Sequence, residues 1–339
     1  MATETDLEII EDAQLPEGEE LDRLIDYVFA HRKDAIKGFL RDEELQISGN
    51  KSVLRDRIDE ALADGTIDAG GLIGLLDTIE GWGNQHIYLF KVTDGEKLAW
   101  QSEARAKKRL QKIDAEELFN RRRPLVLPDE PTLSSVEWST DRVRFIWVEK
   151  REWNLRRDDL DCEEDGVLYK AYEDKVARGI TSFDWNLNTG HAALMIQRLP
   201  TGERYDQIRQ EYEEAIEDAV HISNFTRVKI SKAIKKLEKS DEVNNRQVAH
   251  ETGQGSRAQF TSKSRKADAF DDPDLKKARD ALGQTSSVLG NFYWQPNDGK
   301  LDRQIHTKLY ASDQRVGVFG ECTEEEVQYV LSRIRHFGR

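Results

Sequence analysis

The stretch FLRDEELQISGNKSVLRDRIDEAL, Phe39–Leu62, decides how the first part of the chain folds. Leu40 lies at the end of one expected helix, and Leu54 and Ile58 repeat at helical spacing in the next. Between the two helices, Ser48-Gly49-Asn50 supplies turn residues and a side-chain oxygen that can cap the second helix. The pattern therefore predicts a helix, a short extended turn and a second helix.

This arrangement, over about residues 32–62, resembles the SAP motif, a small helix–extended–helix module that binds DNA. The residues that match the motif are Leu40, Leu45, Ser48, Gly49, Lys51, Leu54, Arg57 and Ile58. The chain departs from the motif at Glu43-Glu44, where a small residue or glycine usually precedes the buried leucine. The resemblance implies contacts with duplex phosphates, which position a protein on DNA without reading its sequence.

The start of the second helix is the expected phosphate site. Free N–H groups and the positive end of the helix dipole suit a phosphate there, and Lys51 stands in the first turn. Arg55 and Arg57 project from different sides of the apolar stripe. We therefore expect Lys51 and Arg55 to contact phosphate, and Arg57 to contribute less. The preceding helix would extend the patch through Arg32, Lys33, Lys37 and Arg41.

The overall composition describes a charge-rich chain. It has 339 residues, 34% of them charged, and a net charge of −14. This charge argues against a protein that coats nucleic acid indiscriminately, so local clusters decide where a polyanion binds. Apolar runs are too short for a membrane helix, and the two cysteines form neither a disulfide framework nor a zinc pattern. We expect an intracellular protein, nuclear in a eukaryote and cytoplasmic or nucleoid-associated in a prokaryote.

Two further segments concentrate positive charge. Residues 105–123 hold eight bases and three acids, a net of 8 − 3 = +5. Residues 227–239 hold six bases and one acid, a net of 6 − 1 = +5. Either segment could simply be a solvated helix face, but both could also contact DNA. The candidate DNA-binding residues in these segments are Arg105, Lys108, Arg109, Lys112, Lys229, Lys232, Lys236 and Lys239.

The pattern of elements predicts an α+β fold. Residues 1–20 are expected to form an acidic tail, which either solubilises the chain or competes with DNA for its basic faces. Residues 21–120 are predicted to be a helical SAP-like domain, and the proline-rich segment 121–132 a linker. Residues 133–339 show strand patterning with helices, which predicts a mixed, mainly antiparallel sheet domain with a mobile polar loop at 240–272.

A search for catalytic patterns favours binding over catalysis. The chain lacks a phosphate loop, a zinc-protease HExxH and an esterase GxSxG, so we predict no catalytic, metal-ligating or cofactor-binding residues. One alternative is open. Asp165, Glu173 and Lys175 resemble the PD-(D/E)xK nuclease pattern, although its proline is missing. In such a Mg²⁺-dependent nuclease the acids hold the metal.

A wider resemblance concerns the layout of the chain. A Leu-Leu-Asp helix followed by Gln85-His86, and a strand-rich region that opens with the Val-Arg-Phe-Ile-Trp of residues 143–147, resemble the centromere protein N family. That family binds DNA within a chromatin complex and pairs with a sister subunit through its β-rich domain. The resemblance implies a protein partner for the C-terminal domain and leaves a purely structural interaction subunit as an alternative.

The main hypothesis is a non-enzymatic protein that binds double-stranded DNA. It would act as a subunit of a larger chromosomal or DNA-processing assembly, with no membrane contact.

Overall fold

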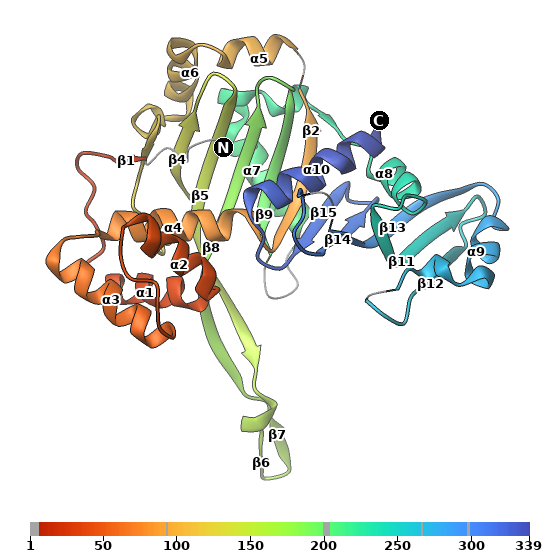
Figure 1. Ribbon diagram of the computed structural model, residues 1–339, viewed down its shortest axis with the longest axis horizontal. Helices are drawn as coiled ribbons and strands as arrows, with labels where there is room; N and C mark the ends of the chain where they lie inside the picture. Colours follow the sequence, from red (N-terminus) through yellow and green to blue (C-terminus); the bar gives the residue numbers. More distant parts are fainter. Residues whose placement is uncertain (1–6, 93, 199–203, 266, 297–298) are drawn as a thin grey trace.

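The protein is an α+β fold built on one large mixed sheet (Figure 1). The computed structural model describes residues 7–92, 94–198, 204–265, 267–296 and 299–339. Within these residues 13 strands form the sheet, in the order β1-β3-β4-β5-β8-β9-β2-β15-β14-β13-β11-β12, with β10 paired to β2. The pair β1–β3 is parallel and the other named pairs are antiparallel, so the predicted α+β class with a mainly antiparallel sheet is confirmed.

The strands differ widely in length. They are β1 (Glu8–Ile9), β2 (Gln85–Lys91), β3 (Arg121–Arg122), β4 (Thr132–Trp138), β5 (Arg142–Arg156), β6 (Cys162–Glu164), β7 (Val167–Tyr169), β8 (Tyr172–Asn186), β9 (His191–Gln197), β10 (Thr226–Arg227), β11 (Val243–Thr252), β12 (Arg257–Thr261), β13 (Thr285–Trp294), β14 (Ile305–Tyr310) and β15 (Arg315–Phe319).

Helices pack around the sheet and in a group at the N-terminal end. They are α1 (Glu19–Ala30), α2 (Lys33–Asp42), α3 (Lys51–Asp64), α4 (Ala69–Trp82), α5 (Asp94–Trp100), α6 (Glu103–Leu110), α7 (Tyr205–Val220), α8 (Ile230–Leu237), α9 (Pro273–Asp280) and α10 (Glu324–Gly338). Among the described residues, no helix has both the length and the apolar character needed to cross a membrane.

Among the described residues, three large apolar cores and a small fourth one around Ile146, Val148 and Ile180 hold these elements together. Helices α1–α4 share one core that includes Leu24, Leu40 and Ile58. The left half of the sheet in Figure 1 packs against α6 and α7 through a core rich in aromatic rings, including Trp185. The other half packs against α8 and α10 through residues such as Phe292. Helices such as α8 and α10 therefore turn their apolar residues toward the sheet.

The segment predicted from Phe39–Leu62 is helical at both ends and extended between them. The Asn50 side chain caps α3 by accepting a hydrogen bond from Val53 N at 3.0 Å. Gly49 has φ +121°, and a Cβ there would lie 2.8 Å from Val53 Cβ, so this turn requires glycine. Glu44 has φ 57°, in the left-handed region that glycine prefers, at the position where the SAP motif usually has a small residue.

The centre of the sheet contains a strand from residues 21–120, the part of the chain predicted to be a helical domain. Residues 85–92 are compatible with either a strand or a continuing helix. The structure shows the strand β2, buried along most of its length and paired to β9 and β15. Because β2 precedes the proline-rich segment 121–132, this segment does not separate the sheet from what comes before it. Val126, within the segment, is itself buried in the core of α1–α4.

Two segments expected to be mobile are ordered instead. The stretch 240–272 contains the antiparallel hairpin β11–β12, so the predicted mobile loop is wrong. Its buried residues, such as Val248 and Phe260, are too few to show a pattern in a polar sequence. In the predicted acidic tail, residues 1–6 lie outside the described residues. Glu8–Ile9 forms the edge strand β1, because Ile9 packs against Gly70 and the backbone pairs with β3.

A long β-ribbon projects from the sheet. Strands β5 and β8 pair over 15 residues each, from Arg142 opposite Asn186 to Arg156 opposite Tyr172. Figure 1 shows this ribbon extending well below the other strands, with the small hairpin β6–β7 at its tip. We call the far part of this ribbon with its tip, residues 153–176, the arm.

Helix α4 joins the N-terminal helices to the sheet through buried charges. Arg178 of β8 donates to Glu80 at 2.5 Å and also to Asp77, and all three side chains are at most 5% exposed. Gly81 lets Arg144 approach the helix, since a Cβ there would lie 2.6 Å from Arg144 Nη2. Removing one partner of such a buried pair costs about 3–5 kcal/mol, so this junction fixes α4 on the sheet.

Candidate nucleic-acid interface

Lys51, the expected phosphate ligand at the start of α3, is bound within the chain. Its Nζ donates to the main-chain oxygens of Phe29 at 2.8 Å and His31 at 2.5 Å. These carbonyls belong to the C-terminal end of α1, where a lysine satisfies oxygens that the helix leaves unpaired. Lys51 therefore ties α3 to α1 while remaining exposed at the surface.

The two arginines of α3 are also engaged. Arg55 donates to Asp26 at 2.6 Å, and this hydrogen bond raises the pKa of the guanidinium. Arg57 donates to the main-chain oxygens of Gln46 at 2.8 Å and of Ser48, which holds the extended turn in place. The structure thus gives all three predicted ligands a role inside the fold.

The preceding helix offers more available charge. Lys37 is half-buried and Arg41 is exposed. Within the described residues neither side chain has an ion pair or a hydrogen bond.

The second basic segment, residues 105–123, is largely neutralised by nearby acids and carbonyls. Arg109 lies 3.6 Å from Glu96 and donates to the main-chain oxygen of Ala219 at 3.4 Å. Arg105 donates to the Leu98 oxygen at 3.4 Å. The remaining pairs are Lys107 with Glu103, Arg121 with Glu8 and Glu11, Arg122 with Asp77, and Arg123 with Glu117.

Only part of this segment's charge remains available. Lys108 and Lys112 are exposed, and within the described residues neither has a partner. Glu8 and Glu11 of the predicted acidic tail contact Arg121. An acidic tail that competes with DNA for the basic faces would make contacts of this kind.

Helix α8 presents the third basic segment in a different way. Ile230, Ala233, Ile234 and Leu237 are buried and form the apolar face of this helix. The opposite face consists of the exposed lysines Lys229, Lys232, Lys235, Lys236 and Lys239. In the described part of the chain no carboxylate pairs with any of these lysines. Lys236 donates to the main-chain oxygen of Arg339 at 3.0 Å.

The one acid of this segment faces inward. Glu238 is buried and lies 3.2 Å from His250, so it does not offset the lysines at the surface.

Further positive charge surrounds the start of α8. Lys91, the last residue of β2, pairs with Thr226 on one side and His191 on the other. Lys97 of α5 packs on the adjacent turn, since a Cβ on Gly190 would lie 3.1 Å from its Cδ. From α10, Arg335 donates to the Ala192 oxygen at 3.4 Å.

His191 lies among these cations. Burial, followed by the positive charges of Arg335, Arg339, Lys91 and Lys97, lowers the pKa of His191 to about 4. We call this region the β2–α8 surface, made of Lys91, Lys97, His191, Lys229, Lys232, Lys235, Lys236, Lys239, Arg335 and Arg339. The sequence indicates the lysines of α8, but Lys91, Lys97 and the α10 arginines join them only through the fold.

The three basic segments do not form one surface. In Figure 1, α3 lies at the lower left, α6 at the top and α8 at the right of the sheet. A ligand on the β2–α8 surface is therefore remote from α3.

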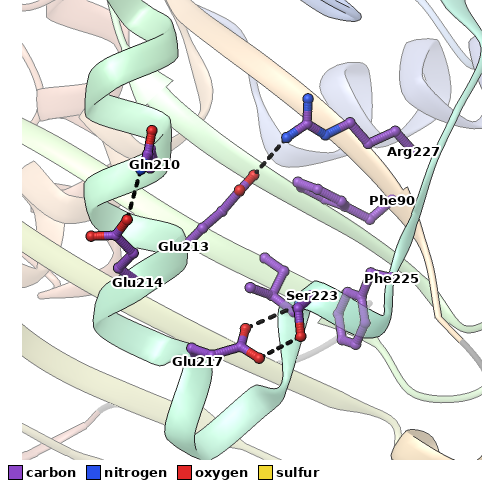
Figure 2. Close-up of a pocket in the computed structure, with 9 residues that line it drawn as sticks. Phe90, Gln210, Glu213, Glu214, Glu217, Ser223, Phe225 and Arg227 are labelled. Carbon is purple, nitrogen blue, oxygen red and sulfur yellow. Dashed lines mark hydrogen bonds and ion pairs between the residues drawn. The ribbon is translucent and has the colours of Figure 1, made fainter.

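A hollow of about 430 Å³ lies between α7 and residues 222–227 (Figure 2). Glu213 and Glu217 point into it beside Phe225. Glu213 pairs with Arg209 at 2.5 Å and lies 3.6 Å from Arg227, and Glu217 accepts a hydrogen bond from the Ser223 hydroxyl at 2.5 Å. Acidic walls repel phosphate, so this hollow is not part of the nucleic-acid interface.

The residues of the nuclease alternative lie on the arm. Glu173 is paired with Arg157 at 2.8 Å and with Lys175, and these bonds lower its pKa. Asp165 stands at the β6–β7 turn. Among the described residues there is no group of three or more His, Cys, Asp or Glu side chains arranged to hold a metal ion. The nuclease alternative stays a prediction.

Comparison with known proteins finds no matching family model and no matching curated protein. The SAP-like and centromere protein N resemblances therefore stay predictions as well.

Proposed function

We propose that this chain is a non-enzymatic DNA-binding protein that holds duplex phosphates mainly on the β2–α8 surface. The observation that carries the proposal is the exposed row of α8 lysines that no carboxylate of the described residues neutralises. Lysines exposed at a surface bind phosphate by displacing condensed counterions, which gives affinity without sequence specificity. The positive charges around His191 extend the same surface.

The SAP-like module would have a smaller part in this function. Lys37 and Arg41 on α2 remain available, whereas Lys51, Arg55 and Arg57 are held by oxygens of the chain. We propose that α2 makes a second, weaker phosphate contact at a separate place on the molecule.

The arm supports a role in a larger assembly, which is the second candidate function. Its exposed apolar residues are Leu155, Leu160, Val167, Leu168, Tyr169, Tyr172 and Val176. Soluble chains rarely expose apolar side chains in one group unless the group binds a partner. Glu163, Glu164 and Asp165 at the tip have no ion pair within the described residues. We propose that the arm docks on a protein whose surface is both apolar and basic.

Duplex binding measured by fluorescence anisotropy tests the main proposal. The probe is a labelled 20-base-pair duplex, titrated with the full chain at several salt concentrations. We expect binding that weakens steeply with salt, and weaker binding by the variant Lys229→Gln/Lys232→Gln/Lys236→Gln. Absence of duplex binding at low salt, or equal binding by the variant, would overturn the proposal.

A further inference from the structure

The sheet half formed by β13, β14 and β15 has one packed face and one partly open face. Along β14, Ile305, Thr307 and Leu309 are buried, whereas His306, Lys308 and Tyr310 between them are only partly buried. The buried face packs against α8 and α10. Alternation of this kind shows a sheet with solvent on one side.

Aromatic rings line the open face in a row across three strands. Tyr293 of β13 pairs with His306 of β14, which pairs with Phe319 of β15. The Tyr293 and His306 rings stack with centroids 4.6 Å apart, and the His306 and Phe319 centroids are 4.8 Å apart. Tyr310 lies further along β14 on the same face. We call these four residues, with the cations beside them, the aromatic sheet face.

Cations accompany these rings. Arg315 lies 4.4 Å from the centre of the Tyr310 ring, Lys308 lies 5.1 Å from that ring, and Arg198 lies 5.3 Å from the Phe319 ring. Burial, followed by the positive charges of Arg265, Lys308 and Arg198, lowers the pKa of His306 to about 4. The open face is therefore both aromatic and positively charged.

One of these cations is paired with an acid: Arg315 lies 2.9 Å from Asp313. Lys308 and Arg198 have no ion pair within the described residues, so they supply the net positive charge of this face.

We propose that the aromatic sheet face binds single-stranded nucleic acid. Unpaired bases stack on aromatic side chains exposed by a sheet, while nearby cations contact the phosphates of the same strand. The bases of a duplex are already stacked on each other and cannot use such a surface. The buried face carries α8, so this site lies on the opposite side of the sheet from the lysines proposed to bind duplex DNA. It does not depend on that proposal.

Anisotropy titrations with fluorescein-labelled oligo(dT) and oligo(U) of 20 nucleotides test this inference on the full chain. We expect both probes, or one of them, to bind at low salt. The double variant Tyr293→Ala/Tyr310→Ala should bind about tenfold more weakly, as expected when bases lose stacking partners. The variant Tyr293→Phe/Tyr310→Phe keeps both rings and should bind within about twofold of the original chain. Comparing the two probes shows whether the strand is DNA or RNA.

Two further variants separate stacking from general effects. Tyr169→Ala/Tyr172→Ala removes two exposed tyrosines from the arm and should leave binding unchanged. Lys308→Glu alters a charge without removing a ring, so it tests the site even if the alanine variant unfolds. It should weaken the binding of each probe that the original chain binds. The proposal is overturned if neither probe binds, or if Lys308→Glu and a folded Tyr293→Ala/Tyr310→Ala bind as the original chain does.

Discussion

Helices α3 and α8 carry similar basic residues, but the fold uses them differently. In α3, Lys51, Arg55 and Arg57 all donate to oxygens of neighbouring segments. In α8 the lysines are exposed, and among the described residues only Lys236 has a partner, the Arg339 oxygen. The one acid of the segment, Glu238, is buried against His250. The charge of a segment therefore does not show whether that charge is available to a ligand, and the predictions below test this difference.

The largest effect on duplex affinity is expected from replacing the α8 lysines. Replacing Lys229, Lys232 and Lys236 with glutamine should weaken duplex binding at least about tenfold at low salt. The slope of log affinity against log salt is negative, and its magnitude should decrease by about 2.7, since each lost phosphate contact removes about 0.9. Anisotropy across a salt series measures both quantities.

A matched control removes the same charge elsewhere. Replacing Lys150, Lys170 and Lys175 of the ribbon with glutamine should leave duplex affinity within about twofold of the original chain. Charges outside the contact are screened by salt and act only weakly on the DNA. An equal loss in both triple variants would show that net charge alone decides binding.

Arg57→Ala should affect stability rather than binding. It removes the hydrogen bonds that fix the turn at Gln46 and Ser48, and we expect the free energy of unfolding to fall by about 1–2 kcal/mol. Duplex affinity should stay within about twofold. Urea unfolding, followed by circular dichroism, measures the first quantity. A large loss of affinity in a folded Arg57→Ala protein would contradict the distinction between α3 and α8.

His191 should make stability depend on pH. Its pKa is about 4 in the folded chain and near 6.5 when exposed, so the unfolded chain binds more protons between these values. Stability should therefore fall as the pH drops from about 6.5 to about 4. Because the ring is partly exposed, the contribution should stay below about 1 kcal/mol. Urea unfolding of His191→Gln at pH 7 and pH 5 should show a smaller loss of stability than the original chain. An identical loss would argue against a pKa lowered by burial and by the positive charges around this ring.

The smallest effect is expected for Arg55→Ala. The pair with Asp26 is solvent-exposed, so its loss should change the free energy of unfolding by about 0.5 kcal/mol. Asp26→Ala should have the same small effect, and the double variant should show whether the pair interacts. A loss well above 1 kcal/mol would mean that the pair is more than a surface contact.

Much of the fold follows from sequence patterns that each involve one element. The apolar stripes of α7 and α8 and the capping box of Thr323 with Glu326 each follow from residue spacing within one helix. Strand β2 was ambiguous, because a strand buried on both faces shows no alternation. The hairpin β11–β12 was missed because its sequence is mostly polar, with few buried side chains to reveal a period.

The candidate site was predictable only in part. The lysine face of α8 follows from its helical spacing. Lys91 and Arg335 join that face through sheet pairing and helix packing, which no local pattern reveals. The sequence also does not distinguish a lysine at the start of a helix that binds phosphate from one that, like Lys51, donates to the end of another helix.

Lysine footprinting tests the central claim most directly. The unmodified chain is acetylated with and without a 20-base-pair duplex, and the reactivity of each lysine is measured by mass spectrometry. We predict that DNA protects Lys229, Lys232 and Lys236, while Lys51 keeps the same reactivity in both samples. Protection of Lys37 and Lys51 with unchanged reactivity along α8 would contradict the account.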